Sequence, residues 1–328
     1  MLRARAVVLL AFPCACGTAD AGPAAAPRDY AVVHGWPRLG EGLVLGQVAG
    51  VAIDSTGAPW IFHRPGQPWF GEAQSETIAT PTLLRLDPMT GVITAALAAD
   101  RFVTPHGLRI DDADHFWLTD VGLHQVFELS PQGEVLQVLG AGGRGTDEDH
   151  FDGPTDVAWV GEEVFVADGY GNGRVMVFDR GGGFVRQWGQ LGDGPGEFFE
   201  PHAIVADDHG RLLVADRGNR RIQRFATDGS FLDAFAGEDI GRPWALDFDA
   251  DGALWVVDGG DQNPLPPDRA RVYALDLDSG AVRESFGSFG NYDGQLYWGH
   301  DLAVGAEGEI FVGDVYYGMR VQKFVRGG

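Results

Sequence analysis

Short runs of alternating apolar and polar residues follow one another along most of the chain, with turn-forming residues between them. The runs Val164–Ala167, Arg174–Phe178 and Phe184–Trp188 show the pattern well, because they are rich in β-branched and aromatic residues and are separated by glycines. Alternation with a period of two is typical of strands that are buried on one side. No long segment has the spacing of an amphipathic helix. The pattern predicts an all-β protein.

A short phrase recurs along the chain, in which a β-rich run ends in aspartate, or in histidine in the divergent first copy. Another apolar run precedes each phrase, and the copies lie roughly 50 residues apart, which fits a four-stranded unit. We therefore predict a six-bladed β-propeller whose repeat aspartates make turn and inter-strand hydrogen bonds. The copies are Pro59–His63, Phe116–Asp120, Val164–Asp168, Arg211–Asp216, Leu254–Asp258 and Ile310–Asp314.

The two ends of the repeat region complement each other. The last copy holds three strand-like runs, and an unassigned run, Tyr30–His34, precedes the first copy. We expect this N-terminal strand to complete the last blade, because a closed ring leaves no sheet edge unpaired.

Residues 1–26 look separate from the propeller, which we place at residues 27–328. A basic start, Met1–Arg5, precedes the apolar run Ala6–Phe12, and this order favours a secretory signal over a membrane span. An Ala, Gly and Pro-rich tether follows, and Cys16 is a candidate lipid attachment site. We expect a secreted or cell-envelope protein with no transmembrane span and no cysteine in its mature body.

Composition narrows the partners. The formal net charge is −23, and Lys323 is the only lysine, so the chain lacks the basic track that nucleic acid requires. The acidity is typical of a soluble protein outside the cytoplasm. We expect a monomer that acts on a small molecule or a peptide.

Three histidines occupy the same position in every second copy of the repeat: His106, His202 and His300. In a six-bladed ring, residues from alternate copies converge on the axis about 120° apart. Three imidazoles in that arrangement suit a metal ion with one open coordination position. A lone histidine is more often structural, and the histidines outside this repeat position are left out of the predicted site. They are His34, His63, His115, His124, His150 and His209.

A more specific likeness lies in segments that cover nearly the whole ring. In order along the chain they include Leu45–Asp54, Ile61–Arg64, Pro105–Leu108, Leu118–Phe127, Pro154–Val157, Val166–Arg174, Pro201–His202, Val214–Arg217 and His300–Asp301. The phrase as a whole resembles the NHL type of propeller repeat. These segments resemble the peptidyl-α-hydroxyglycine α-amidating lyase family, which completes C-terminal amidation of peptides in animals.

The resemblance implies a zinc lyase. The positions that match the zinc ligands of the family are His106, His202 and His300, the same residues that the repeat selects. Zinc would polarise the hydroxyl of a peptidyl-α-hydroxyglycine, whose N–C bond breaks to give an amide and glyoxylate. Tyr170 matches the active-site tyrosine, as base or as transient ligand. Arg64 and Arg217 match active-site arginines, which suit a substrate carboxylate.

The resemblance also implies a structural calcium ion on the axis. The match places the carboxylate of Asp301 and the backbone carbonyls of Val51 and Leu108 around it, and oxygen ligands suit calcium. Two positions depart from the family pattern. Gly171 stands where a cysteine is expected, and Trp298 stands where the family has a methionine that lines the substrate site.

Two other functions fit the sequence. A propeller hydrolase or lactonase would keep the fold and the metal but perform a different reaction. A non-catalytic NHL module of the cell envelope would recognise a peptide or glycan at the mouth of the ring, but it has no need for three histidines in matched positions.

Overall fold

The computed structural model describes residues 30–69, 74–262 and 268–327. The signal, the tether and Cys16 lie outside the described residues, so their predictions stay untested. All regular structure in the described part is β-strand. No helix there is long and apolar enough to cross a membrane.

The strands form six four-stranded sheets, which we call blades one to six. Blade one contains β2 (Gln47–Ile53), β3 (Pro59–Arg64), β4 (Leu83–Leu86) and β5 (Ile93–Leu97). Blade two contains β6 (Pro105–Ile110), β7 (Phe116–Asp120), β8 (Gln125–Leu129) and β9 (Val135–Leu139). Blade three contains β10 (Pro154–Val160), β11 (Glu163–Asp168), β12 (Arg174–Asp179) and β13 (Phe184–Trp188). Blade four contains β14 (Pro201–Ala206), β15 (Leu212–Asp216), β16 (Arg221–Phe225) and β17 (Phe231–Ala236). Blade five contains β18 (Pro243–Phe248), β19 (Leu254–Asp258), β20 (Arg271–Leu275) and β21 (Val282–Phe286). Blade six contains β22 (Gly299–Val304), β23 (Ile310–Asp314), β24 (Arg320–Arg326) and β1 (Tyr30–Val32).

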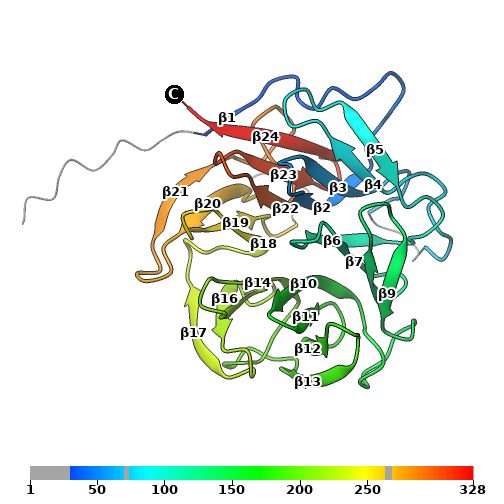
Figure 1. Ribbon diagram of the computed structural model, residues 1–328. Helices are drawn as coiled ribbons and strands as arrows, with labels where there is room; N and C mark the ends of the chain where they lie inside the picture. Colours follow the sequence, from blue (N-terminus) through cyan, green and yellow to red (C-terminus); the bar gives the residue numbers. More distant parts are fainter. Residues whose placement is uncertain (1–29, 70–73, 263–267, 328) are drawn as a thin grey trace, which may run out of the picture.

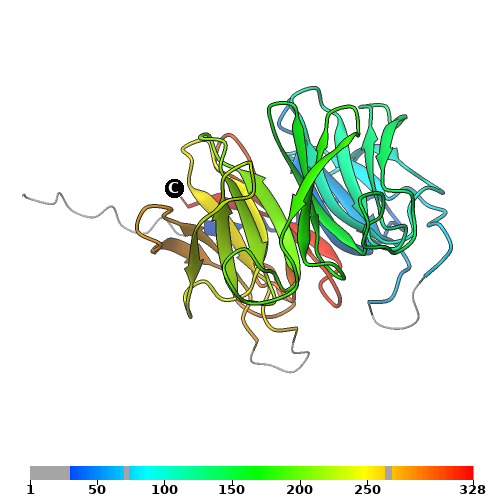
Figure 2. The same cartoon turned by 90° about the horizontal axis from the view of Figure 1, so that it is seen from below.

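The blades surround a central axis, and the first strand of each lies nearest to it (Figure 1). The view turned by 90° shows the blades standing side by side around the ring (Figure 2). β1 pairs antiparallel with β24 and supplies the outer strand of blade six. The predicted six-bladed propeller and its closure by the N-terminal strand are confirmed.

The apolar core lies between neighbouring blades rather than in one central mass. Each of six large clusters joins two adjacent sheets, as where Leu213 of β15 packs with Leu246 of β18. The second strands are almost fully buried, whereas outer strands such as β13 alternate between half-buried and exposed residues. An outer strand has one face toward the neighbouring blade and the other toward water, so its residues alternate between half-buried and exposed. For this reason the outer strands show the clearest apolar–polar alternation in the sequence.

The repeat aspartates are buried hydrogen-bond acceptors. Each ends the second strand of its blade and accepts N–H groups from the segment that leads into the first strand. Asp120 accepts from Val103 and Thr104 at 2.7 and 3.0 Å, and Asp314 accepts from Tyr297 and Trp298. The interpretation of these residues as turn and hydrogen-bond residues is confirmed. In blades two to six, these bonds fix the loop that leads into the first strand.

Tyr30 anchors the closing strand β1, so we expect its loss to lower the stability of the protein. Its ring stacks on Phe286 with 4.7 Å between centroids, and its hydroxyl donates to the carbonyl of Gly308. We expect Tyr30→Ala to lower the free energy of unfolding by about 2 kcal/mol, because the substitution leaves a gap at the closing strand. Urea unfolding measures the change. Tyr292→Ala is the control, because that side chain is 82% exposed. Equal effects of the two substitutions would contradict this role of β1.

Candidate metal centre

The first strand of every blade carries an irregularity near its start, and this irregularity positions the candidate site. In blades four and six, the pairing with the second strand skips His202 and His300. In blade two it skips His106 and Gly107. A bulged residue is released from the pleat and its side chain is redirected. The three histidines meet on the axis, with ring centroids 4.7–4.8 Å apart.

Backbone carbonyls of the intervening blades orient the three imidazoles. Nδ1 of His106 lies 2.9 Å from the carbonyl oxygen of Thr155. Nδ1 of His202 lies 2.6 Å from that of Trp244, and Nδ1 of His300 lies 2.7 Å from that of Ala49. A carbonyl can only accept, so each Nδ1 carries a proton and donates it. The Nε2 lone pairs are therefore left for a ligand on the axis.

The imidazoles are kept neutral, as a metal ligand must be. Burial holds the pKa of all three well below the ordinary histidine value. The positive charge of Arg217 lowers all three pKa values further, and that of Arg64 lowers those of His106 and His300. The hydroxyl of Tyr170 lies 2.9 Å from Nε2 of His106 and 3.2 Å from Nε2 of His202. The buried Nε2 of His300 has no hydrogen-bond partner.

The residues present fit a zinc ion. Nitrogen atoms of the three histidines lie within 4.8 Å of one another, and all three residues are buried. Two other groups in the described residues could offer three ligand atoms, but neither is fully buried. Three neutral imidazoles that leave one position open are a ligand set of catalytic zinc sites. The buried Nε2 of His300 lacks a hydrogen-bond partner, which costs folding free energy, and a bound ion would remove that cost.

Two arginines flank the three histidines. Arg64, at the end of β3, donates from Nε to the carbonyl of Pro105 at 2.5 Å, and burial lowers its pKa. Arg217, directly after β15, donates from Nη2 to Glu200 at 2.9 Å. Nη1 of Arg217 is buried and has no hydrogen-bond partner. That nitrogen is therefore available to an anionic ligand beside the histidines.

Three aromatic rings lie against these arginines, and two of them, Trp244 and Trp69, were not predicted from the sequence. The guanidinium of Arg217 lies 4.6 Å from the ring centroid of Trp244 and 5.4 Å from that of Tyr170. The guanidinium of Arg64 lies 5.5 Å from the ring of Trp69. Trp244 could have been found, because it occupies in blade five the repeat position of the histidines. Glu200 and Trp69 lie in connecting segments, where the repeat gives no signal.

Trp298 lies one layer behind the site. Its side chain is fully buried and stacks on Tyr316 at 4.5 Å, and its ring lies 5.8 Å from Trp69. Trp69 in turn lies 6.3 Å from His300. The expected contact of Trp298 with substrate stays a prediction, and the structure shows it packed behind Trp69.

His63, the first-copy residue at the repeat aspartate position, lies outside the metal centre. Its Nδ1 accepts the N–H of Gly46 at 3.2 Å, and its Nε2 donates to the carbonyl of Pro81 at 3.2 Å. Both ring nitrogens therefore have partners within blade one and the loops next to it.

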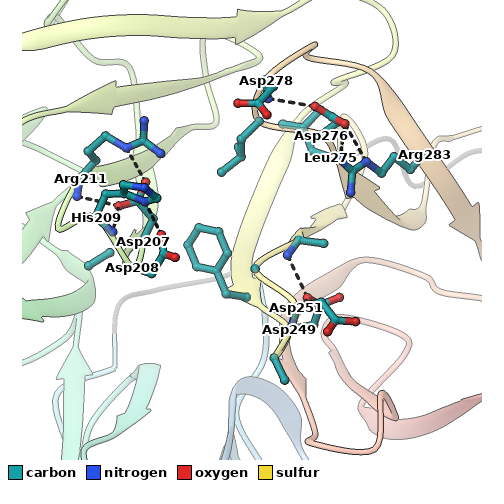
Figure 3. Close-up of a pocket in the computed structure, with 16 residues that line it drawn as sticks. Asp207, Asp208, His209, Arg211, Asp249, Asp251, Leu275, Asp276, Asp278 and Arg283 are labelled. Atoms are coloured by element: carbon teal, nitrogen blue, oxygen red, sulfur yellow. Dashed lines mark hydrogen bonds and ion pairs between the residues drawn. The ribbon is translucent and has the colours of Figure 1, made fainter.

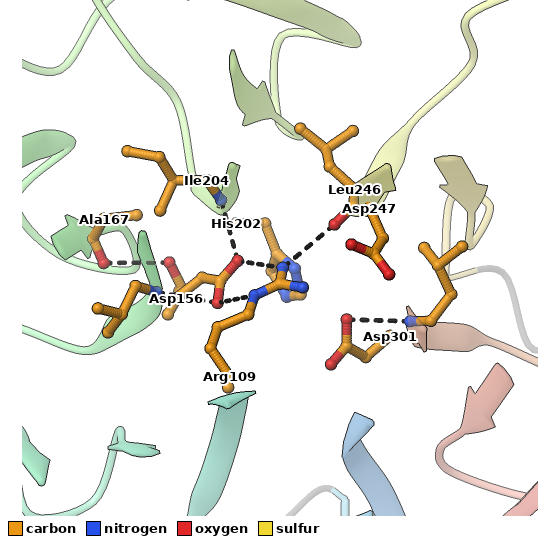
Figure 4. A network of polar contacts seen from close by, with 12 residues as sticks. Arg109, Asp156, Ala167, His202, Ile204, Leu246, Asp247 and Asp301 are labelled. Carbon is orange, nitrogen blue, oxygen red and sulfur yellow. Dashed lines mark hydrogen bonds and ion pairs between the residues drawn. The ribbon is translucent and has the colours of Figure 1, made fainter. Parts of the chain in front are cut away.

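Asp301, the expected carboxylate ligand of calcium, lies on the axis next to the histidines. A small cavity of about 10 Å³ separates the imidazoles from Asp156 and Asp301. Both carboxylate oxygens of Asp301 already accept backbone N–H groups, from Val51 at 2.8 Å and from Leu302 at 3.0 Å. The guanidinium of Arg109 lies in the same cluster (Figure 4). The guanidinium carries a positive charge that repels a calcium ion beside these carboxylates, so the residues present fit calcium poorly.

A larger cavity lies elsewhere in the ring. It has a volume of about 450 Å³ and lies between the ends of β14 and β18 (Figure 3). His202 lies near the opposite end of β14, at the start of the strand. Asp207, Asp249 and Asp276 line it, and each accepts N–H groups of its own turn. These carboxylates are explained as turn residues, and we assign the cavity no function.

Comparison with known proteins decides the family. Residues 144–241 match a family model described as a 6-bladed beta-propeller. The peptidyl-alpha-hydroxyglycine alpha-amidating lyase 2 of Drosophila melanogaster is 30% identical, over 92% of this chain and 77% of the relative. The chain belongs to the peptidyl-α-hydroxyglycine α-amidating lyase family.

A longer relative agrees with this assignment, and a solved structure shares the fold. The peptidyl-glycine alpha-amidating monooxygenase B of Xenopus laevis is 35% identical over 86% of this chain. The chain spans about a third of that relative, since 34% of its length is covered. A solved streptogramin B lyase has a TM-score of 0.57 and 13% identity, over 87% of this chain and 95% of that one. At this identity the likeness shows the fold alone.

The three buried histidines of this amidating-lyase family member predict zinc binding that depends on each of them. We expect the purified protein to hold one zinc ion per chain and His300→Ala to lose it, because two imidazoles bind zinc much more weakly than three. Elemental analysis after extensive dialysis measures the content. His209→Ala is the control, because His209 belongs to an exposed group of possible ligands. Loss of zinc in the control and retention in His300→Ala would contradict the assignment.

Proposed function

We propose that the protein is a zinc-dependent lyase that cleaves the N–C bond of a peptidyl-α-hydroxyglycine or a similar carbinolamide. The observation that carries this proposal is the unpaired Nε2 of His300 among three neutral imidazoles, with Tyr170 and Arg217 beside them. Membership of the amidating-lyase family supports the same reaction. We further propose that the protein acts outside the cytoplasm, as its N-terminal sequence suggests.

The proposed reaction needs only a proton transfer and one bond cleavage. The substrate hydroxyl loses its proton, and the oxygen electrons form the aldehyde carbonyl of glyoxylate. The N–C bond breaks, and its electron pair goes to nitrogen, which takes up a proton and leaves as the amide. No oxidant or reductant is needed. The site must hold the hydroxyl, accept its proton and bind the carboxylate.

The residues around the histidines divide these tasks. Zinc, when bound by the three Nε2 atoms, would lower the pKa of the substrate hydroxyl. The phenol oxygen of Tyr170 lies within hydrogen-bonding distance of two of these nitrogens, so it stands where that proton is released. Arg217 offers its unpaired Nη1 to the substrate carboxylate. Arg64 places a second positive charge beside the developing anion.

Glyoxylate release tests the reaction. We expect the protein to release glyoxylate from α-hydroxyhippurate, to lose this activity with a chelator and to recover it with zinc. Tyr170→Phe should lower kcat by about 10² to 10⁴, which is the usual contribution of a positioned acid or base. Tyr292→Phe, at an exposed site, should leave kcat unchanged. A zinc-loaded protein that releases no glyoxylate would overturn the lyase and favour a hydrolase or lactonase.

Arg217 predicts a specific dependence on the substrate carboxylate. We expect Arg217→Met to raise KM for α-hydroxyhippurate by about ten- to a hundred-fold, the effect of one lost charge-assisted hydrogen bond. With the methyl ester of the same compound, the variant and the parent should differ little. Steady-state kinetics on both compounds measures this. An equal loss on acid and ester would show that Arg217 acts through the packing of Trp244 and not through the carboxylate.

A further inference from the structure

Beyond the histidines, the axis carries one guanidinium and three carboxylates. Arg109 lies three residues after His106 on β6, and its side chain points into the ring (Figure 4). Asp156 of β10, Asp247 of β18 and Asp301 of β22 face the same space. All four residues belong to the first strands of their blades. Their charges therefore meet at the point where the blades converge.

The three aspartates share one hydrogen-bonding pattern. Each accepts the N–H of the residue that follows it and the N–H of a first-strand residue in the next blade. These bonds fasten neighbouring first strands to each other near the axis. The pairs are Val157 and Ile204 for Asp156, Phe248 and Val304 for Asp247, and Leu302 and Val51 for Asp301.

Arg109 connects this cluster across the ring. Its Nε donates to Oδ1 of Asp156 at 2.9 Å, and its Nη2 donates to Oδ2 of the same residue at 2.6 Å. The same Nη2 donates to the carbonyl of Leu246 at 3.2 Å. Blade two is thereby joined to blades three and five. Burial opposes the charge of Arg109, but Asp156 and Asp301 outweigh it and raise the pKa of the guanidinium.

We propose that the guanidinium of Arg109 supplies the axial positive charge of this propeller, in the place where the family resemblance implies a calcium ion. Three carboxylates converge on one point, of which Asp156 and Asp301 are buried and Asp247 is half-buried, and they need a cation nearby. Arg109 meets that need with a planar group that forms two parallel bonds to one carboxylate. With this charge in place, the protein folds without calcium.

The cluster also acts on the metal centre, as a positioning element. The strands that carry the three histidines are all held by it: β6 through Arg109, β14 through the N–H of Ile204, and β22 through the N–H of Val304. The contacts lie two to four residues along each strand from its histidine. Arg109 is therefore a positioning residue: it acts on the three imidazoles through the strands that carry them.

Calcium titration of the unaltered, zinc-loaded protein is the first test. We expect isothermal titration with calcium chloride to show no bound calcium, and we expect millimolar calcium to leave Tm unchanged relative to magnesium at the same ionic strength. One calcium bound per chain, with a rise in Tm, would overturn the proposal. This arm needs no variant and does not depend on the lyase activity.

The second test asks whether loss of the guanidinium creates a need for calcium. In calcium-free buffer, we expect Arg109→Ala to lower Tm by about 5 °C, because it leaves buried carboxylates without their cation. It should weaken zinc binding about tenfold, the lower range for residues that orient metal ligands. Calcium, which can enter through the cavity of about 270 Å³ that Arg109 and Asp247 line, should restore both quantities.

Two controls separate charge from general damage. Arg109→Lys keeps a positive charge, so it should show a smaller fall in Tm and no response to calcium. Arg186→Ala removes an arginine that pairs with Glu163 away from the axis, so any loss of stability should be insensitive to calcium. Equal Tm and zinc affinity in Arg109→Ala and the parent would overturn the proposal, and so would a variant that calcium fails to restore.

Discussion

The hydrogen bonds from the three histidine Nδ1 atoms to backbone carbonyls are the interaction on which the candidate site depends. Each joins a bulged histidine in one blade to the bulged residue of the next, Thr155, Trp244 or Ala49. One bond therefore fixes the tautomer and the direction of the ring, and it also ties two blades together. The bond of His300 can form only if the propeller is closed, because its acceptor, Ala49, lies in blade one at the other end of the chain.

Ring closure and the metal centre are thus two consequences of one arrangement. β1 completes blade six, which brings β22 next to β2 and places the carbonyl of Ala49 beside His300. The repeat aspartates hold the loops before the first strands, and the axial aspartates clasp those strands to one another. A single blade supplies at most one of the three histidines, and the closed ring places those of blades two, four and six around one axis.

The fold could be predicted from the sequence to a large extent because the repeat is periodic. A strand that ends in Asp120, Asp168 or Asp314 recurs with its partners, and the position of His106 within the repeat identifies His202 and His300 as its equivalents. The structure brings these three together as that phase requires. The repeat shows which residues occupy equivalent positions, and the closed ring brings these equivalent residues close together on the axis.

Other residues of the site do not occupy a recurring position in the repeat. Glu200 and Trp69 reach Arg217 and Arg64 from connecting segments whose course depends on packing. Arg109 occurs once in the ring, so no repeat marks it, and only the structure shows its contact with Asp156. The expected substrate contact of Trp298 rests on a correspondence with relatives and stays a prediction, and the structure adds the packing of Trp298 against Trp69.

An anomalous difference map, collected at the zinc absorption edge from crystals of the zinc-loaded protein, tests the central claim most directly. The account predicts one strong peak on the axis, bonded to Nε2 of His106, His202 and His300, and no metal peak beside Arg109. A zinc peak at the exposed Asp207–His209 group with none between the three histidines would contradict it.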